Sequence, residues 1–275
     1  MSDILVGLDE GALAAHWRHH SLGAQTPFDI ATSGGALADR FAWCFVAGYQ
    51  ATLRSLFPTL HADGWASFVV SESTTAPERH PPTAVANDGR LHGTKSWVAA
   101  VAHVDQLIVK AGRGPDARFL LIPTNRQGVT LDQYPPGKFL SDLSQGSARF
   151  EGVSIDPADD VSVETARTFG YWEPLYVHIA IIAMLGNHSR AQGDDALANR
   201  CTTWLETARP LTETSVNASF FESAANLDTD AHTIADAFAQ TLLKRAECQL
   251  RGWENDHRLL SMYSKGIQSR AGRTA

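Results

Sequence analysis

Hydrophobic residues recur with two different periods along the chain, and the changes of period divide it into three zones. In the first zone, up to about residue 60, apolar side chains fall at every fourth position. This spacing predicts a helix with one buried stripe, formed by Leu37, Phe41, Phe45, Tyr49 and Leu53. A Gly-, Pro- and Thr-rich stretch at 22–35 precedes the stripe, and we expect it to be irregular.

In the second zone, from Trp65 to about Ile155, the period is two and turn signals recur about every 8 to 12 residues. This pattern predicts a small antiparallel β sandwich or barrel. Residues 88–109 predict a β-hairpin, with Trp97 close to its turn. The remaining candidate strands are 66–73, 83–93, 105–112, 117–124, 128–134 and 148–156.

In the third zone the helical period returns and continues to the end of the chain. Residues 172–205 predict one long helix or a kinked pair, and 210–227 a second helix that begins at Pro210. A third, 228–253, has Asp228 or Thr229 as its cap and carries an apolar face, and the basic tail 265–275 is expected to fray. That apolar face consists of Ile234, Phe238 and Leu242.

The predicted architecture is therefore α+β, with three regions in order along the chain. We expect a short helical region at 1–62, a central antiparallel β domain at 63–162 and a helical bundle at 163–275. A hydrophobic content of 44% is enough for a substantial core.

Charge and cysteine content narrow the classes of function. A net charge of −7, without clusters of Lys and Arg, argues against binding to nucleic acid. Cys44, Cys201 and Cys248 are widely spaced, which suggests buried free thiols in a reducing compartment. The first residues lack the basic region of a signal peptide, and the longest apolar run, 175–186, is too short to span a bilayer. We expect a cytoplasmic protein with no membrane partner.

Four motifs, in the same order along the chain, resemble the acyl-CoA dehydrogenase family of flavoproteins. Members of that family have an α-helical region, a central β domain and a four-helix bundle, with FAD at the junction. The resemblance covers about residues 65 to 162 well, and the neighbouring helices loosely. The motifs are "VVSES" (69–73), "DGRLHGTKSWVAA" (88–100), "RFLLIPTNRQGVTL" (118–131) and "ARFEGVSIDPADDV" (148–161).

The resemblance implies a place for the flavin. The family's hairpin tryptophan packs against the flat ring, so Trp97 would form one wall of the site. Backbone groups near Val98 and Ala99 and the hydroxyl of Ser71 would then meet the polar edge of the ring. The alternative is that Trp97 fills the seam between sheet and bundle with no cofactor beside it.

Several departures from the family pattern predict weak or substoichiometric FAD. Ala99 stands where the family has a hydroxyl, and no Arg-x-x-Phe-Gly or Gly-Gly-x-Gly tract is present. Glu72 is in register with a family residue near the flavin, although it could equally be an acid at a strand end that faces water. Gly146 and Ser147 remain from an Arg-Gly-Ser motif, and by resemblance they lie with Glu72 on the substrate side.

The family's reaction needs a carboxylate that removes the proton next to a thioester carbonyl while a hydride goes to the flavin. Glu173, with aromatic neighbours, is the candidate base by resemblance to members that supply it from the first bundle helix. The alternative is that Glu173 occupies the first turn of a helix, where an acid suits the dipole and Pro174 suits the start. His16, His19 and His20 have the spacing of metal ligands, but a solvated helix face explains them better, and we expect no metal.

The function indicated is α,β-dehydrogenation of an acyl-CoA or acyl-carrier-protein thioester by a shortened, divergent flavoprotein. The alternatives are a flavin-poor or inactive scaffold, and a member of the flavin monooxygenase branch. The apolar stripes at 37–53 and 234–242 lack partners in so short a chain, which predicts a homodimer or homotetramer. An electron-transfer partner would complete the reaction.

Overall fold

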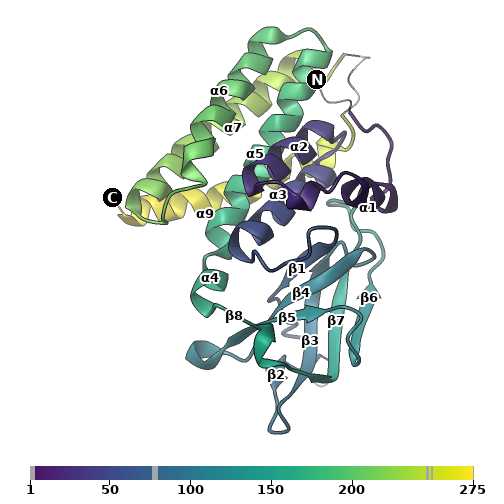
Figure 1. Cartoon of the computed structure of the whole chain (residues 1–275). Coiled ribbons are helices and arrows are strands. Elements are labelled where there is room, and N and C mark those ends of the chain that lie inside the picture. The colour runs from purple at the N-terminus through teal and green to yellow at the C-terminus, as the bar shows by residue number, and fades with distance from the viewer. Residues whose placement is uncertain (1–3, 76–79, 246–247, 249, 275) are drawn as a thin grey trace.

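A computed structural model describes residues 4–75, 80–245, 248 and 250–274 of the chain. Figure 1 shows the helices gathered in one block and two β sheets in the other, with the short helix α4 at the boundary. The expected α+β fold class is confirmed: N-terminal helices, central sheets and C-terminal helices follow one another in that order.

The first zone contains three helices, where the sequence predicted one helix after an irregular stretch. That prediction was wrong for 22–35. Thr26 caps a helix by accepting a hydrogen bond from the backbone of Asp29, and Pro27 suits the first helical position. The chain then turns at 38–40, which separates Leu37 from the rest of the stripe. The helices are α1 (Glu10–His19), α2 (Pro27–Leu37) and α3 (Phe41–Leu56), with a 3₁₀ turn, η1, at Leu22–Ala24.

Two four-stranded sheets form the β domain. The first has the order β1-β4-β5-β8 and the second β2-β3-β7-β6. All pairs are antiparallel except β1 and β4, because β1 enters the sheet from α3 instead of from a hairpin. The strands are β1 (Trp65–Val69), β2 (Ala84–Val85), β3 (Arg90–Ala99), β4 (Val104–Ala111), β5 (Arg118–Pro123), β6 (Val129–Gln133), β7 (Gln145–Ser154) and β8 (Asp160–Val161), with 3₁₀ turns η2 (Gly114–Asp116) and η3 (Pro157–Asp159).

The expected hairpin at 88–109 is wrong, because β3 and β4 belong to different sheets. Between them Ala100 adopts a φ of +54°, and its carbonyl accepts hydrogen bonds from His103 and Val104. This tight crossover carries the chain from one sheet to the other. The actual hairpin joins β2 to β3 through a turn at Gly89, so Trp97 lies near the far end of a ten-residue strand.

The bundle divides differently from the prediction. Pro210 lies near the end of one helix instead of at the start of another, and Asp228 is buried in the middle of a continuous helix that Asn217 caps. The tail is helical as far as Thr274. The helices are α4 (Val163–Arg167), α5 (Phe169–Ala191), α6 (Asp195–Leu211), α7 (Ala218–Thr241), α8 (Trp253–Asp256) and α9 (Arg258–Thr274).

Both apolar stripes that predicted an oligomer find partners within the chain. Phe41, Phe45, Ile234 and Phe238 are all buried in the large core around α3 and α5. The premise of that prediction is therefore wrong, and these stripes no longer argue for a dimer. Cys44 and Cys201 are buried free thiols, whereas Cys248 is half-buried. Among the described helices, none combines the length and apolar character that crossing a membrane requires.

Candidate functional site

Trp97 lies where the second sheet meets the helices. The pairing of β3 with β7 shifts register between Lys95 and Val98, so the ladder skips Ser96 and Trp97. A bulge of this kind redirects a side chain, and such bulges are common beside active sites. Ser96 is held instead by the carbonyl of Ser71, which accepts its N–H at 2.9 Å.

The indole of Trp97 is half-buried, with one side packed on helix α3. Its ring meets those of Phe45 and Tyr49 edge to face, at 6.4 and 6.3 Å between centroids. Its Nε1 donates to the side-chain oxygen of Gln145 at 3.1 Å. Trp97 is thus fixed in orientation without being fully enclosed, as a wall of a site for a flat ligand would be.

The other predicted cofactor contacts lie around this indole, and they differ in whether their polar groups are available to bind a ligand. Ser71 is exposed, and its hydroxyl has no hydrogen-bond partner among the described residues. Val98 and Ala99 are buried in β3 and pair with β7. The N–H of Ala99 already donates to the hydroxyl of Ser67 at 3.2 Å. The structure therefore leaves the Ser71 hydroxyl open to a ligand, but not the amide of Ala99.

Glu72 is bound by two cations. Its carboxylate accepts a hydrogen bond from Lys95 Nζ at 2.7 Å and one from Arg113 at 3.3 Å. The backbone N–H of Thr83 donates a third, at 3.1 Å. These donors outweigh partial burial and hold the pKa of Glu72 below its usual value. Lys95 is itself buried, not at a surface turn, so this pair ties the segment that follows β1 to β3.

Gly146 and Ser147 lie inside the second sheet. Gly146 pairs with Val98 on one side and Gln133 on the other, and Ser147 pairs with Asp132. Both are buried. A side chain at Gly146 would overlap the carbonyl oxygen of Asp132, so glycine is needed for the close approach of β6. The structure gives both residues a packing role in the sheet.

Glu173 stands at the junction of three helices. Helix α5 begins at Phe169, so Glu173 is beyond its first turn and Pro174 lies inside the helix. The alternative that placed both residues at a helix start is therefore wrong. Tyr263 of α9 and the phenol of Tyr49 on α3 both lie close enough to the Glu173 carboxyl to influence its charge. Tyr49 also contacts Trp97, which links the two predicted site residues.

The carboxyl of Glu173 is unusually basic. Part of the residue remains accessible, yet the protein around it removes most of its hydration. Burial raises the pKa of Glu173 to about 7, although the neighbouring Tyr263 lowers it. Within the described part of the chain, no Lys, Arg or His forms an ion pair with it. Glu173 therefore exchanges its proton near neutral pH, as a general acid or base must.

A polar cluster that sequence patterns did not reveal lies between α5, α7 and α9. Asp228 is buried on α7 and accepts hydrogen bonds from Ser264 and Gln268 of α9, at 2.7 and 2.9 Å. His178 of α5 approaches the same carboxylate at 3.3 Å. These interactions hold the pKa of Asp228 at about 2, so it stays ionised and is a poor proton acceptor. The cluster joins three helices, and the hydroxyl of Ser264 lies 2.7 Å from the Asp228 carboxylate and 2.7 Å from Nε2 of His232 on α7.

Tyr49 and Tyr263 were missed because no local pattern connects them to Glu173. Tyr49 was one member of an apolar stripe, and Tyr263 follows Glu173 by a long stretch of chain. A phenol in an otherwise apolar stripe was the one available signal. The histidines of α1 do pack together, with the rings of His16 and His20 stacked at 4.0 Å. Among the described residues, no three ligand-type side chains are grouped to hold a metal ion.

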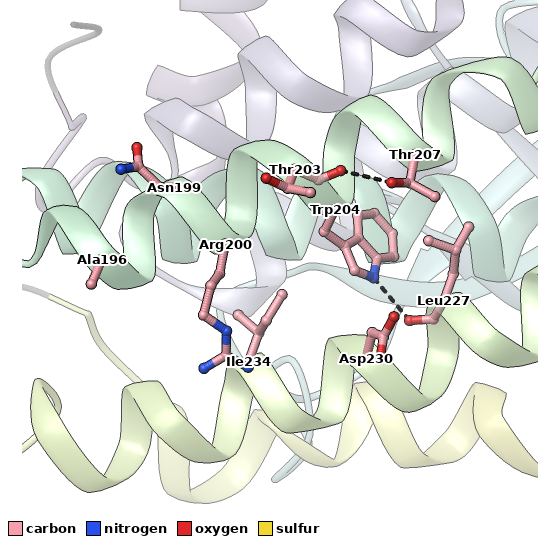
Figure 2. A pocket seen from close by; sticks show the side chains of 9 residues that line it. All are labelled: Ala196, Asn199, Arg200, Thr203, Trp204, Thr207, Leu227, Asp230 and Ile234. Carbon is pink, nitrogen blue, oxygen red and sulfur yellow. Dashed lines mark hydrogen bonds between the residues drawn. The ribbon is translucent and has the colours of Figure 1, made fainter.

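A large groove lies elsewhere, between α6 and α7. It has two adjoining lobes of about 390 and 380 Å³ that share Thr207, Leu227 and Asp230. Figure 2 shows the first lobe, where the indole of Trp204 donates to the carbonyl of Leu227 and Arg200 reaches across the groove. None of the predicted site residues lines it.

Comparisons with known proteins identify the fold. No protein-family model and no curated protein sequence matches the chain. Solved structures do match, over nearly the whole chain and at low sequence identity. FkbI, titled for biosynthesis of a methoxymalonyl extender unit, is 15% identical with a TM-score of 0.65, over 97% of this chain and 92% of its own. The FAD complex of PigA is 14% identical with a TM-score of 0.59, over 98% and 89%.

A third similar structure is a glutaryl-CoA dehydrogenase from Mycobacterium smegmatis in complex with FADH2. It is 15% identical with a TM-score of 0.56, and the match covers 98% of this chain and 95% of that one. The similarity extends through the helices as well as the β domain that carries the motifs. The chain has the fold of the acyl-CoA dehydrogenases.

Proposed function

We propose that the protein is a flavin-dependent oxidoreductase that acts on an acyl thioester by α,β-dehydrogenation. The observation that carries the proposal is Glu173, a carboxyl with a pKa of about 7 at the junction of helices and β domain. Tyr49 connects it to the half-buried indole of Trp97. A proton acceptor and a flat apolar wall thus lie on either side of one tyrosine.

The residues around Trp97 fit the ring of a flavin better than its polar edge. The bulge presents an indole face held by Gln145, and the free hydroxyl of Ser71 is nearby. The amide of Ala99 is occupied by Ser67, so it cannot also bind the ring. One hydrogen bond fewer costs about 0.5–1.5 kcal/mol, which favours weak flavin binding over none.

In this proposal each residue of the chain has a limited task. Trp97 would orient the flavin, which would supply a hydride acceptor for the β carbon of the substrate. Glu173 takes the proton from the α carbon, because its pKa lies near the working pH. Tyr49 separates the two groups and is itself fixed, since its hydroxyl accepts the N–H of Phe68 at 2.7 Å.

The substrate class is a thioester of coenzyme A or of a carrier protein. This part of the proposal draws on a similar structure that is titled as a glutaryl-CoA dehydrogenase. An electron-transfer partner would reoxidise the flavin. The proposed substrate contact of Glu72 is better replaced by a structural role, because its carboxylate is bound by Lys95 and Arg113.

A second candidate function is that of a scaffold that keeps the fold without the flavin. Two observations favour it: Trp97 Nε1 and the Ala99 amide both have partners inside the protein. A site that needs no ligand to satisfy its polar groups is stable when empty. The two candidates differ in one measurable property, which is binding of the cofactor.

The experiment is a titration of FAD while the tryptophan fluorescence is followed, in the wild type and in Trp97→Phe. The enzyme proposal expects saturable quenching at micromolar FAD, reduced in Trp97→Phe. Trp204→Phe is the matched control, because Trp204 lies in the groove between α6 and α7 and its loss should leave the titration unchanged. Absence of quenching up to millimolar FAD would favour the scaffold.

A further inference from the structure

The imidazole of His178 is buried inside the bundle with one of its two ring nitrogens unpaired. The residue lies on α5 and is 2% exposed, and its Nδ1 is 2.5 Å from the carbonyl oxygen of Pro174. Because a carbonyl can only accept, Nδ1 carries the hydrogen of that bond. Nε2 forms no hydrogen bond with any group in the described part of the chain. In the neutral ring Nε2 is therefore a buried acceptor that lacks a donor.

A carboxylate lies beside the same nitrogen. Oδ1 of Asp228, on α7, is 3.3 Å from Nε2 of His178, although the two atoms form no hydrogen bond. Asp228 is 3% exposed, and Ser264 and Gln268 of α9 donate to its carboxylate at 2.7 and 2.9 Å. A carboxylate has about four acceptor sites, so these two bonds leave room for a further donor. The nitrogen and the carboxylate can share that donor.

The charge of Asp228 also needs a partner. Hydrogen bonds outweigh burial and hold the pKa of Asp228 at about 2, so the carboxylate is ionised at neutral pH. The basic side chains recorded near it are His178, at 3.3 Å, and the part-exposed His232, at 3.8 Å. Neither imidazole is a cation unless it takes up a second proton. A buried anion without a cation is costly, and a bound cation removes that cost.

A small cavity adjoins both groups. It measures about 10 Å³, and His178 and Asp228 line it together with walls that are mostly apolar or aromatic. This volume corresponds to one group of about the size of a water molecule. Trp204 and Leu227 line both this cavity and the groove between α6 and α7, so the two are neighbours. Figure 2 shows the hydrogen bond from the Trp204 indole to the Leu227 carbonyl that closes this shared wall.

We propose that His178 and Asp228 form a binding site for an ammonium group. Ammonium has about the size of water, it donates to the ring nitrogen and to the carboxylate at once, and it supplies the missing positive charge. A water molecule supplies the two donors but not the charge. The aromatic wall at Trp204 also favours a cation. The site goes beyond the proposed reaction, since no residue assigned to the flavin or the thioester belongs to it.

Two sources offer such a group, the free ammonium ion and the head of a primary amine. The free ion needs the small cavity alone. An amine needs its apolar chain to pass the wall formed by Trp204 and Leu227 and to lie in the groove, whose lobes measure about 390 and 380 Å³. The volume of the cavity favours the free ion, and the two sources are separate arms of the experiment.

The test is the unfolding temperature of the whole chain near neutral pH, in ammonium chloride and in sodium chloride of equal ionic strength. We expect a saturable rise that is specific to ammonium, about 3 °C when ammonium exceeds its Kd tenfold. Butylammonium chloride is the second probe. A rise with ammonium alone identifies a site for the free ion, and a rise with both probes identifies a site for an amine head group. Equal unfolding temperatures in sodium and ammonium chloride overturn the inference.

Two variants locate the effect. Asp228→Asn keeps the shape of the side chain but removes its charge, and His178→Phe removes Nε2, so the ammonium-specific rise should disappear in both. Asp230→Asn is the matched control, because Asp230 lies on the same helix as Asp228 and lines the groove but not the cavity. Its rise should equal that of the wild type. A rise that survives in Asp228→Asn places the ammonium elsewhere and overturns the inference.

A measurement on the wild type keeps the inference testable if these variants do not fold. Ammonium labelled with nitrogen-15 and held in the cavity should give a proton signal distinct from that of the free ion, with cross-relaxation to the ring protons of His178 and Trp204. Absence of this signal at saturating ammonium overturns the inference. So does a second proton on His178 in ammonium-free buffer, seen in its ring nitrogen shifts, because that proton would supply the missing charge itself. None of these measurements involves FAD, so failure of the cofactor to bind leaves them unchanged.

Discussion

Glu72 and Glu173 were both predicted as site residues, and the structure gives them opposite surroundings. Glu72, three residues beyond the end of β1, is bound by Lys95, Arg113 and a backbone N–H, and its pKa is lowered. Glu173, at the junction of α3, α5 and α9, forms no ion pair with a cation among the described residues, and burial raises its pKa to about 7. The first carboxylate is fixed in its charged form, whereas the second can change its charge near neutral pH.

This difference shows what distinguishes a carboxylate with a structural role from one that can transfer a proton. Both groups are partly buried, so burial alone does not distinguish them. The neighbouring cations do, because they stabilise the ionised form by more than its lost hydration costs. A carboxyl that is desolvated without a cation has a pKa suited to proton transfer.

The largest expected effect comes from removing the charge of Glu72. Glu72→Gln leaves Lys95, which has a 1% exposed side chain, buried without its anion. We expect the free energy of unfolding to fall by about 3 kcal/mol, measured by urea denaturation near neutral pH. Glu151→Gln is the control, because its pair with Arg149 is exposed and should contribute less than about 0.5 kcal/mol. Equal effects of the two variants would contradict the structural role of Glu72.

The raised pKa of Glu173 should make its contribution to the free energy of unfolding decrease as the pH rises. Its folded pKa of about 7 exceeds the ordinary value of 4.5, so the folded state binds the additional proton between these values. The contribution of Glu173 to stability is then fully present below 4.5 and is lost as the pH rises through 7. At about 1.4 kcal/mol for each pH unit, wild type should lose up to about 3 kcal/mol relative to Glu173→Gln.

Urea denaturation of wild type and Glu173→Gln at about pH 5 and about pH 8 measures this difference. Glu72 provides the opposite case. Its folded pKa is lowered, so its contribution is present above the ordinary value of 4.5 and is lost as the pH falls through the folded pKa. Parallel pH profiles for wild type and Glu173→Gln would show that Glu173 is an ordinary acid.

A smaller effect tests whether Gly146 packs the sheet or binds substrate. Gly146→Ala places a methyl group against the carbonyl of Asp132, and we expect a loss of about 1–3 kcal/mol in thermal or urea unfolding. Gly137→Ala, where the nearest atom is 4.0 Å away, should cost little. If Gly146→Ala proved as stable as wild type, a contact with substrate would regain support.

The sequence predicted the layers of the fold better than their connections. Period-two and period-four patterns identified the β domain and the long helices, because burial of one face imposes those periods. The hairpin at 88–109 failed because alternation cannot show which sheet a strand joins. The crossover at Ala100 decides that, and a non-glycine residue with positive φ leaves no sign in a hydrophobic pattern.

In the candidate site, too, the sequence predicted some features and not others. Trp97 and Glu173 were predicted from motifs that resemble a family, while their surroundings came from residues distant in the chain. Tyr49 precedes Glu173 by more than a hundred positions and Tyr263 follows it in another helix, so no local spacing could join them. The ion pair of Glu72 could not be predicted, because the burial of Lys95 depends on how β1 and β3 pack, and its contact with substrate stays a prediction.

The central claim is that Glu173 removes the α proton of an acyl thioester. Its most direct test is exchange of that proton with D₂O in the presence of FAD, with acetyl-, propionyl- and butyryl-CoA as probes and mass spectrometry as the readout. The account predicts exchange by the wild type and a loss of about a hundredfold or more in Glu173→Gln. Equal exchange by the two proteins, or none by the wild type with any of the three probes, would contradict it.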